Sequence, residues 1–203
     1  MSKSRYVITV TRQFGSMGRP IARKLAENLG IEYYDRALID LAAQKLGLPA
    51  EQIDAAEESA DSKPTNPFER MAYPLGTRAT AEQDQIFETQ KNIIRFLAEK
   101  ETCVIVGRCA DFVLCDMENT VNIYIYAQYE ARLQHAVQDL GLSEEEARRT
   151  ISRVDKAREN YHMNYAGFKP DDKRFKDIMI DSSFLGIDKT ADFLTIAVKS
   201  RFE

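Results

Sequence analysis

The stretch VITVTRQFGSMGRPIARKLAENLG, from Val7 to Gly30, decides the fold class of this chain. It opens with an apolar run, continues through a loop with two glycines, and ends with apolar residues at helical spacing. A strand, a glycine loop and a helix in this order form the unit in which backbone N–H groups and a helix N-terminus bind phosphate. Phosphate-binding loops of the G-x-x-x-x-G-K-[ST] type carry lysine and a hydroxyl where this loop carries Arg19 and Pro20. The stretch therefore predicts either a phosphate-binding loop with altered chemistry or a plain βα turn.

The physical chemistry of the loop favours phosphate. Gly15 and Gly18 allow the backbone to turn its N–H groups inward, and the following helix directs its positive end at the loop. Arg19 adds a permanent charge and a bidentate fork for phosphate oxygens. We therefore expect Gly15, Ser16, Met17, Gly18 and Arg19 to bind phosphate. The alternative, a glycine turn whose arginines are solvated, stays open at this point.

The rest of the chain alternates strands with helices, which indicates a mostly parallel sheet covered on both faces. Runs rich in β-branched and aromatic residues predict the strands, and apolar residues three or four apart predict the helices. A chain of 203 residues suits one such domain. The expected strands are 6–11, 31–35, 103–107, 121–127 and 177–183, and the expected helices are 19–29, 36–46, 82–100, 129–140, 143–160 and 186–200.

The composition argues against several classes of protein. A formal net charge of −4 argues against a nucleic-acid-binding surface. No apolar run approaches the roughly 18 residues of a membrane span, and the first residues lack the apolar core of a signal peptide. We therefore expect a cytoplasmic protein without a nucleic-acid or membrane partner. Cys103, Cys109 and Cys115 follow no known metal spacing, and we expect them to be reduced and structural.

Ligands of a parallel α/β sheet bind beyond the carboxyl ends of the strands. The residues from Thr11 to Arg19 follow the first predicted strand, Asp35 follows the short strand after it, and Arg108 follows the next. We therefore expect these residues to line one cleft.

One predicted helix carries a run of arginines, of which Arg149 and Arg153 are four apart and share a face. These side chains either pair with acidic neighbours or reach a bound phosphate. The segments 57–81 and 155–172 have few apolar anchors, and we expect both to be mobile without ligand, the second as a hinged flap. We expect His162 to be a surface or packing residue rather than an acid or base.

Two pieces of the chain, TRQFGSMGRPIARKLAENLGI and VIVGRCADFVL, resemble the cytidylate kinase-like family, a divergent relative of the true cytidylate kinases among the P-loop nucleoside monophosphate kinases. The resemblance covers almost the whole chain. It implies an α/β fold of the P-loop NTPase type, a three-layer sandwich with a five-stranded parallel sheet in the order 2-3-1-4-5. It also implies one domain over 1–203, with a core of 1–35 and 101–203, a helical monophosphate-binding insertion at 36–100 and an arginine-rich lid at 141–170.

The resemblance further implies roles for single residues. Asp35 matches the aspartate that opens the monophosphate-binding region, and Arg108 matches the arginine of the GRD stretch that holds the acceptor nucleotide. Cys109 replaces the aspartate of that stretch, and we expect Asp111 to compensate. The resemblance implies acceptor binding by Asp35, Arg36, Arg108 and Asp111, and catalysis by Arg19, Arg149, Arg153 and Arg158.

The family resemblance implies a phosphotransferase that moves the γ-phosphoryl group of ATP, as its Mg²⁺ complex, to a small phosphorylated acceptor. CMP or dCMP is the first candidate, and Ser16, or else Thr11, is the expected ligand of the ion. The missing lysine and hydroxyl of the loop leave a second function open, a non-catalytic protein that binds a nucleotide or phosphometabolite on the same fold. The expected partners are ATP and the acceptor, and we expect a monomer or a homodimer.

Overall fold

The centre of the molecule is a parallel sheet. The computed structural model describes residues 5–35 and 81–202, and its five strands lie in the order β2-β3-β1-β4-β5, as the family resemblance implied. Every neighbouring pair is parallel, so all the carboxyl ends meet at one edge. The strands are β1 (Val7–Arg12), β2 (Glu32–Tyr34), β3 (Cys103–Val106), β4 (Thr120–Tyr126) and β5 (Ile178–Asp181).

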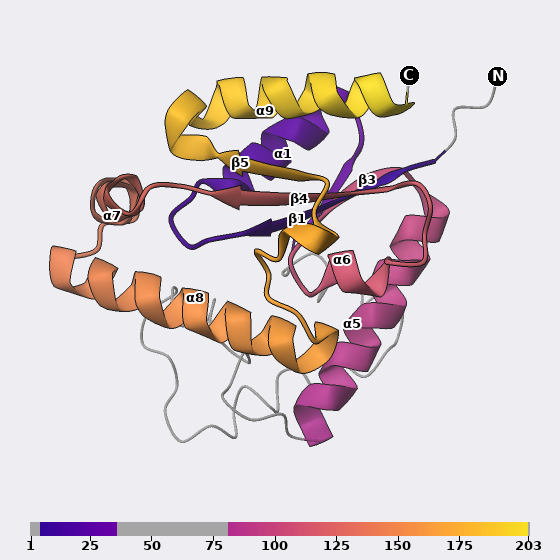
Figure 1. Cartoon of the computed structure of the whole chain (residues 1–203), viewed down its shortest axis with the longest axis horizontal. Helices are drawn as coiled ribbons and strands as arrows, with labels where there is room; N and C mark the ends of the chain where they lie inside the picture. The colour runs from indigo at the N-terminus through magenta and orange to yellow at the C-terminus, as the bar shows by residue number, and fades with distance from the viewer. Residues whose placement is uncertain (1–4, 36–80, 203) are drawn as a thin grey trace.

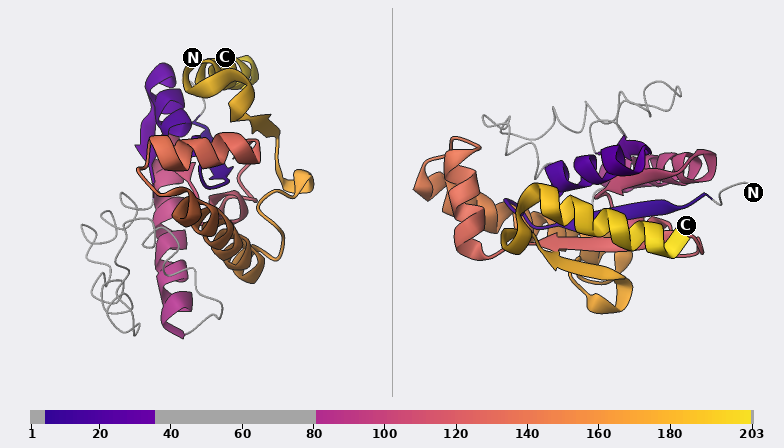
Figure 2. Two further views of the ribbon diagram at one scale, coloured as in Figure 1. Left: turned by 90° about the vertical axis from the view of Figure 1, so that its left-hand side faces the viewer. Right: turned by 90° about the horizontal axis from the view of Figure 1, so that it is seen from above.

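Helices cover both faces of the sheet and make three layers (Figure 1). On one face, α1 (Gly18–Leu29) and α9 (Ser182–Phe202) lie side by side, as the turned views of Figure 2 also show. On the other face lie α5 (Ala81–Lys100), α6 (Ala110–Val113) and α8 (Glu144–Ala166), while α7 (Tyr129–Gln138) stands off the carboxyl edge. A short 3₁₀ turn, η1 (Lys173–Phe175), precedes β5.

The strands are apolar along their whole length because both faces are covered. In β3, Val104 and Val106 pack with α1 and α9, whereas Cys103 and Ile105 pack with α5 and α6. All four side chains are buried. Each large apolar side chain buried in this way contributes about 1.5–3 kcal/mol to folding, which fixes the sheet and therefore its functional edge.

A third apolar cluster holds the glycine loop against the helices beyond the edge. Phe14 is buried among Leu133 and Ala136 of α7 and Ile151 and Val154 of α8. The loop between β1 and α1 is therefore a packed element with a fixed position.

The expected strands and most of the expected helices are confirmed, with boundaries that shift by a few residues. The structure corrects the expected end of the helix 143–160 at residue 160, whereas the mobility expected for 155–172 stays a prediction. Helix α8 continues to Ala166 because His162 and Val154 turn inward and are buried. The expected break at residue 160 therefore does not occur. The short helix α6 and the turn η1 were not expected.

Helix α5, which we assigned to the insertion 36–100, packs against β3 through Ile93 and Ile94 and so belongs to the layer that covers the sheet. The expected helix 36–46, most of the expected mobile segment 57–81 and Arg36 lie outside the described residues. In the part of the chain that is described, no helix has the length and apolar character to cross a membrane.

Candidate functional site

The loop between β1 and α1 turns at two residues with positive φ, Gly15 at 75° and Met17 at 59°. Gly15 has a second reason to be glycine, because a Cβ there would lie 2.9 Å from the carbonyl oxygen of Arg132. Among the described residues, no carbonyl accepts a hydrogen bond from the N–H groups of Gly15, Ser16 or Met17. Unused amide donors thus precede the positive end of the α1 dipole, an arrangement that suits phosphate.

Two side chains fix the backbone of this loop from outside. The N–H of Phe14 donates to Oδ1 of Asp155 in α8 at 2.7 Å, and Nε of Arg132 in α7 donates to the carbonyl of Phe14 at 2.8 Å. Arg132 and Asp155 also form an ion pair with each other. The loop is therefore bound to both helices beyond the edge.

The hydroxyl of Ser16 faces the interior. It is buried and lies 2.9 Å from the carbonyl oxygen of Gln13 and 3.1 Å from that of Ile125. This orientation does not fit the Mg²⁺ ligand that we expected. Within residues 5–35 and 81–202 no group of three or more His, Cys, Asp or Glu side chains comes together as a metal site.

Arg19, which stands in the lysine position of the loop, forms an ion pair with Asp35 at the end of β2. The Arg19 side chain is 47% exposed, whereas that of Asp35 is 6% exposed. Burial lowers the pKa of Arg19, but the charge of Asp35 and the hydroxyl of Tyr33 outweigh burial and raise it. Arg19 therefore ties the start of α1 to the neighbouring strand.

The turn after β3 holds three successive residues at positive φ, Gly107 at 81°, Arg108 at 56° and Cys109 at 52°. The left-handed conformation costs a non-glycine residue about 1–2 kcal/mol, and such strain is concentrated at binding sites. The turn buries Arg108, whose guanidinium carbon lies 5.6 Å from the ring centroid of Tyr161. Nε and Nη2 of Arg108 are buried without a hydrogen-bond partner among the described residues. A buried cation with unused donors is suited to an anionic ligand.

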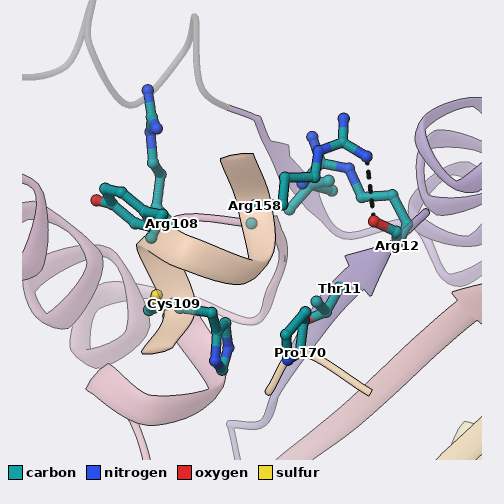
Figure 3. Close-up of a pocket in the computed structure, with 10 residues that line it drawn as sticks. Thr11, Arg12, Arg108, Cys109, Arg158 and Pro170 are labelled. Carbon is teal, nitrogen blue, oxygen red and sulfur yellow. Dashed lines mark hydrogen bonds between the residues drawn. The ribbon is translucent and has the colours of Figure 1, made fainter. Parts of the chain in front are cut away.

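A cavity of about 60 Å³ opens beside this turn, between the carboxyl ends of β1 and β3. Arg12 and Arg158 lie side by side in its wall, and Arg108 stands apart from them (Figure 3). Nη1 of Arg158 donates to the carbonyl oxygen of Arg12 at 3.1 Å. Burial and then the charge of Arg158 lower the pKa of Arg12, and burial lowers the pKa of Arg158 to about 10 although Asp155 raises it. Both guanidiniums remain protonated at neutral pH, so the cavity is cationic.

Asp111, which we expected to contact an acceptor, is engaged inside the protein. Nε2 of His162 lies 3.1 Å from each carboxylate oxygen, and the buried Lys176 forms an ion pair with the same carboxylate. Burial raises the pKa of Asp111, but the hydrogen bond from His162 and the charge of Lys176 lower it to about 2. Nδ1 of His162 lies 2.9 Å from the carbonyl oxygen of Phe168. This network joins α6, α8 and the segment before β5 behind the cavity.

The three arginines expected in the lid do not converge. Arg149 is 75% exposed and pairs with Glu145 on the same helix, and Arg153 is also exposed. Of the three, Arg158 alone lines the cavity.

A second cavity, of about 390 Å³, lies on the other side of the glycine loop. Gly15 and Met17 form its wall on the loop side, and Ala127 and Ser182 form it at the ends of β4 and β5. Gln134 and Gln138 of α7 supply amide groups to it. A cavity of this size at the carboxyl edge is in the range that holds a small ligand.

The residues expected in one cleft are therefore distributed over two cavities at one edge. Thr11 and Arg108 line the smaller cavity and Gly15 the larger one, while Arg19 lies near enough to Arg12 for its charge to lower the Arg12 pKa.

A glycine loop after the central strand of a parallel sheet in this order defines an α/β protein with the P-loop NTPase fold. The chain belongs to the cytidylate kinase-like family, whose sequence profile matches residues 7–184. A cytidylate kinase from Methanopyrus kandleri is 25% identical over 198 residues, which are 97% of this chain and 95% of the relative.

Solved structures share the architecture. An uncharacterized protein from Eubacterium ventriosum is 28% identical with a TM-score of 0.72, and the match covers 97% of this chain and 99% of that one. The shikimate kinase from Acinetobacter baumannii, solved with shikimate, is 14% identical with a TM-score of 0.55 over 99% of this chain and 97% of its own. This second likeness shows the fold alone.

Two features of the site were missed in the sequence. Arg12 lay within the range Thr11 to Arg19 expected at the cleft but was given no role of its own, and no local pattern reports that its side chain meets Gly18 and Gly107. The pairing of Asp111 with His162 and Lys176 joins residues far apart in the chain. For Arg12, the available signal was its place immediately before the glycine loop.

Proposed function

We propose that the protein is an ATP-dependent phosphotransferase that moves the γ-phosphoryl group of ATP to a small phosphorylated acceptor, with CMP or dCMP as the first candidate. The observation that carries this proposal is the cationic cavity beside the glycine loop, whose wall at the carboxyl edge contains the half-buried Arg12 and Arg158 and the buried Arg108. Membership of the cytidylate kinase-like family supports the same reaction class.

The two cavities suggest where the two substrates lie. ATP would bind with its base in the larger cavity and its phosphates along the amides of Gly15, Ser16 and Met17. The acceptor phosphate would lie in the smaller cavity, whose wall includes Arg108, a cation with Nε and Nη2 buried and without a hydrogen-bond partner among the described residues. The glycine loop lies between the two cavities, so the γ-phosphoryl group would pass alongside this loop on its way from ATP to the acceptor.

The chemistry requires little of the protein beyond position and charge. An oxygen of the acceptor monophosphate forms a bond to the γ-phosphorus, the bond from that phosphorus to the β,γ-bridging oxygen breaks, and ADP leaves with the electron pair. Because the acceptor oxygen is already anionic, no protein base is needed. Arg158 would neutralise charge on the transferred group, which is the main route to rate enhancement in phosphoryl transfer. ATP is expected to arrive as its Mg²⁺ complex, and no step here depends on a protein ligand to the ion.

A second candidate function is a non-catalytic nucleotide-binding protein. The observation in its favour is that Arg19 is paired with Asp35 and that Ser16 faces inward, so the loop lacks the lysine and the hydroxyl of related kinases. The two functions share the binding site and differ in turnover.

An assay with ATP, Mg²⁺ and a panel of CMP, dCMP, UMP, AMP and GMP separates the two functions. We expect acceptor-dependent formation of ADP together with the corresponding nucleoside diphosphate, identified by chromatography, with CMP or dCMP the best acceptor. A protein that binds ATP by calorimetry but forms no diphosphate from any acceptor supports the second function. A protein that binds no nucleotide contradicts both.

A further inference from the structure

Arg12 occupies a space that two glycines leave open. A Cβ at Gly18 would lie 2.6 Å from Cβ of Arg12, and a Cβ at Gly107 would lie 2.4 Å from its Nη1 atom. Real Cβ atoms do not approach other atoms this closely, so both positions leave room for the Arg12 side chain. The side chain therefore runs from the glycine loop to the turn after β3, between the two proposed substrate positions.

No carboxylate among the described residues neutralises the charge of Arg12. In the part of the chain that is described, no carboxylate forms an ion pair with Arg12, and its charged neighbours include the cations Arg158, Arg108 and Arg19. The two guanidiniums of Arg12 and Arg158 face the same cavity. Two like charges that are partly withdrawn from water, as the half-buried Arg12 and Arg158 are, repel each other unless an anion lies between or beside them.

Arg19, by contrast, already has an anion. Its guanidinium is paired with the buried carboxylate of Asp35, and nearly half of its side chain is exposed to solvent. A phosphate that recruited Arg19 would have to compete with this ion pair.

We propose that Arg12, together with Arg158, clamps the terminal phosphoryl group of a nucleoside triphosphate, and that Arg12 rather than Arg19 is the phosphate-binding cation of this loop. This inference rests on the proposed function and deepens it, because it names the residue that replaces the missing lysine. Two guanidiniums carry a charge of about +2, which matches a phosphoryl group of charge about −2, and each presents a fork for its oxygens. Arg19 instead holds α1 to β2.

The test measures binding of AMP-PNP, a non-hydrolysable triphosphate, by calorimetry at fixed ionic strength, in the parent, Arg12→Gln and Arg19→Gln. We expect Arg12→Gln to weaken binding at least about a hundredfold and Arg19→Gln to weaken it less than about fivefold. Lys24→Gln removes one cation from the exposed face of α1 and is the control for net charge. Its affinity should equal that of the parent.

Thermal melts check folding in the same variants. AMP-PNP should raise the melting temperature of the parent and of Arg19→Gln but leave that of Arg12→Gln almost unchanged. Gly107→Ala places a methyl group against Nη1 of Arg12 without changing any charge, and it should weaken binding in the same way.

The outcomes are distinguishable. A parent that binds no AMP-PNP defeats the proposed function and the clamp with it. If the parent binds AMP-PNP, two outcomes contradict the clamp alone. Either Arg12→Gln binds AMP-PNP as well as the parent does, or Arg19→Gln loses as much affinity as Arg12→Gln.

Discussion

His162 places its Nε2 atom 3.1 Å from both carboxylate oxygens of Asp111, and both side chains are almost wholly buried. Lys176, with a side chain of 0% exposure, pairs with the same carboxylate. Asp111→Asn removes the anion and leaves a buried ammonium group without compensation. We expect a loss of about 3 kcal/mol in the free energy of unfolding, measured by urea denaturation. Asp116→Asn, which removes an exposed carboxylate paired with Arg95, is the control and should change stability by less than about 0.5 kcal/mol.

The Asp111 carboxyl should also make the free energy of unfolding depend on pH in a specific way. Its pKa in the folded protein is about 2, below the ordinary value of 3.8. A carboxyl with a depressed pKa stabilises the fold in full above its unfolded pKa and loses that contribution as the pH falls through its folded pKa. The advantage of the parent over Asp111→Asn should therefore shrink by about 2 kcal/mol between about pH 5 and pH 2. Urea titrations of both proteins at several pH values measure this difference in the free energy of unfolding. A difference that stays constant or grows in acid contradicts the lowered pKa of Asp111.

Asp155→Ala should loosen the glycine loop. The substitution leaves the N–H of Phe14 and the buried guanidinium of Arg132 without their shared acceptor. We expect the free energy of unfolding to fall by about 2 kcal/mol, less than for a fully buried ion pair because Asp155 is partly exposed. We also expect ATP binding to weaken about tenfold, because the amide groups of the loop would be misplaced. Denaturation and calorimetry measure the two effects. Glu159→Ala removes a carboxylate from the same helix that pairs with the exposed Lys156 and Lys169, and both quantities should then match the parent.

Gly15→Ala and Gly30→Ala separate backbone strain from a steric clash. Both glycines have positive φ, 75° and 64°, but an added Cβ meets the Arg132 carbonyl only at Gly15 and finds nothing within 4 Å at Gly30. Gly30→Ala should cost about 1 kcal/mol of stability from strain alone. Gly15→Ala should cost clearly more and also reduce ATP affinity. Equal losses in the two variants would show that the approach of Arg132 has no energetic consequence.

Arg158→Gln should lower kcat/KM of the proposed reaction about a hundredfold to a thousandfold. Arg158 is the cation of α8 that reaches the cavity, and its loss removes charge where the phosphoryl group is expected. Arg148→Gln, on the exposed side of the same helix and paired with Glu144, should keep the parent rate. Steady-state kinetics give the answer, and a rate for Arg158→Gln within twofold of the parent excludes a catalytic role.

Much of the fold was readable because it is local. The apolar run before Gly15 and the helical spacing after it predicted the unit formed by β1 and α1. Continuous apolar runs predicted the buried parallel strands. Which arginines of α8 meet the cavity was also readable in principle. Arg149 and Arg158 are separated by two and a half turns of an ideal helix and must point to opposite sides. Spacing alone therefore excluded a shared face for these two.

The remaining features of the site depend on contacts that no local pattern reports. In the sequence, Asp111 is a carboxylate next to a turn with no indicated partner. In the structure, its partners His162 and Lys176 come from distant parts of the chain. Ser16 reads as an exposed loop hydroxyl, but Ile125 of β4 supplies a carbonyl that orients it inward. Tertiary packing decided both orientations.

The contact of Gly18 and Gly107 with a single arginine limits how this loop can be redesigned. Any residue with a side chain at position 18 or 107 would collide with Arg12, because the added Cβ would lie 2.6 Å from its Cβ or 2.4 Å from its Nη1 atom. Trimming Arg12 without changing the two glycines would instead leave a gap between the glycine loop and the turn after β3. A redesign that enlarges Gly18 or Gly107 therefore requires a smaller residue at position 12 as well, so these three positions should be exchanged as one block.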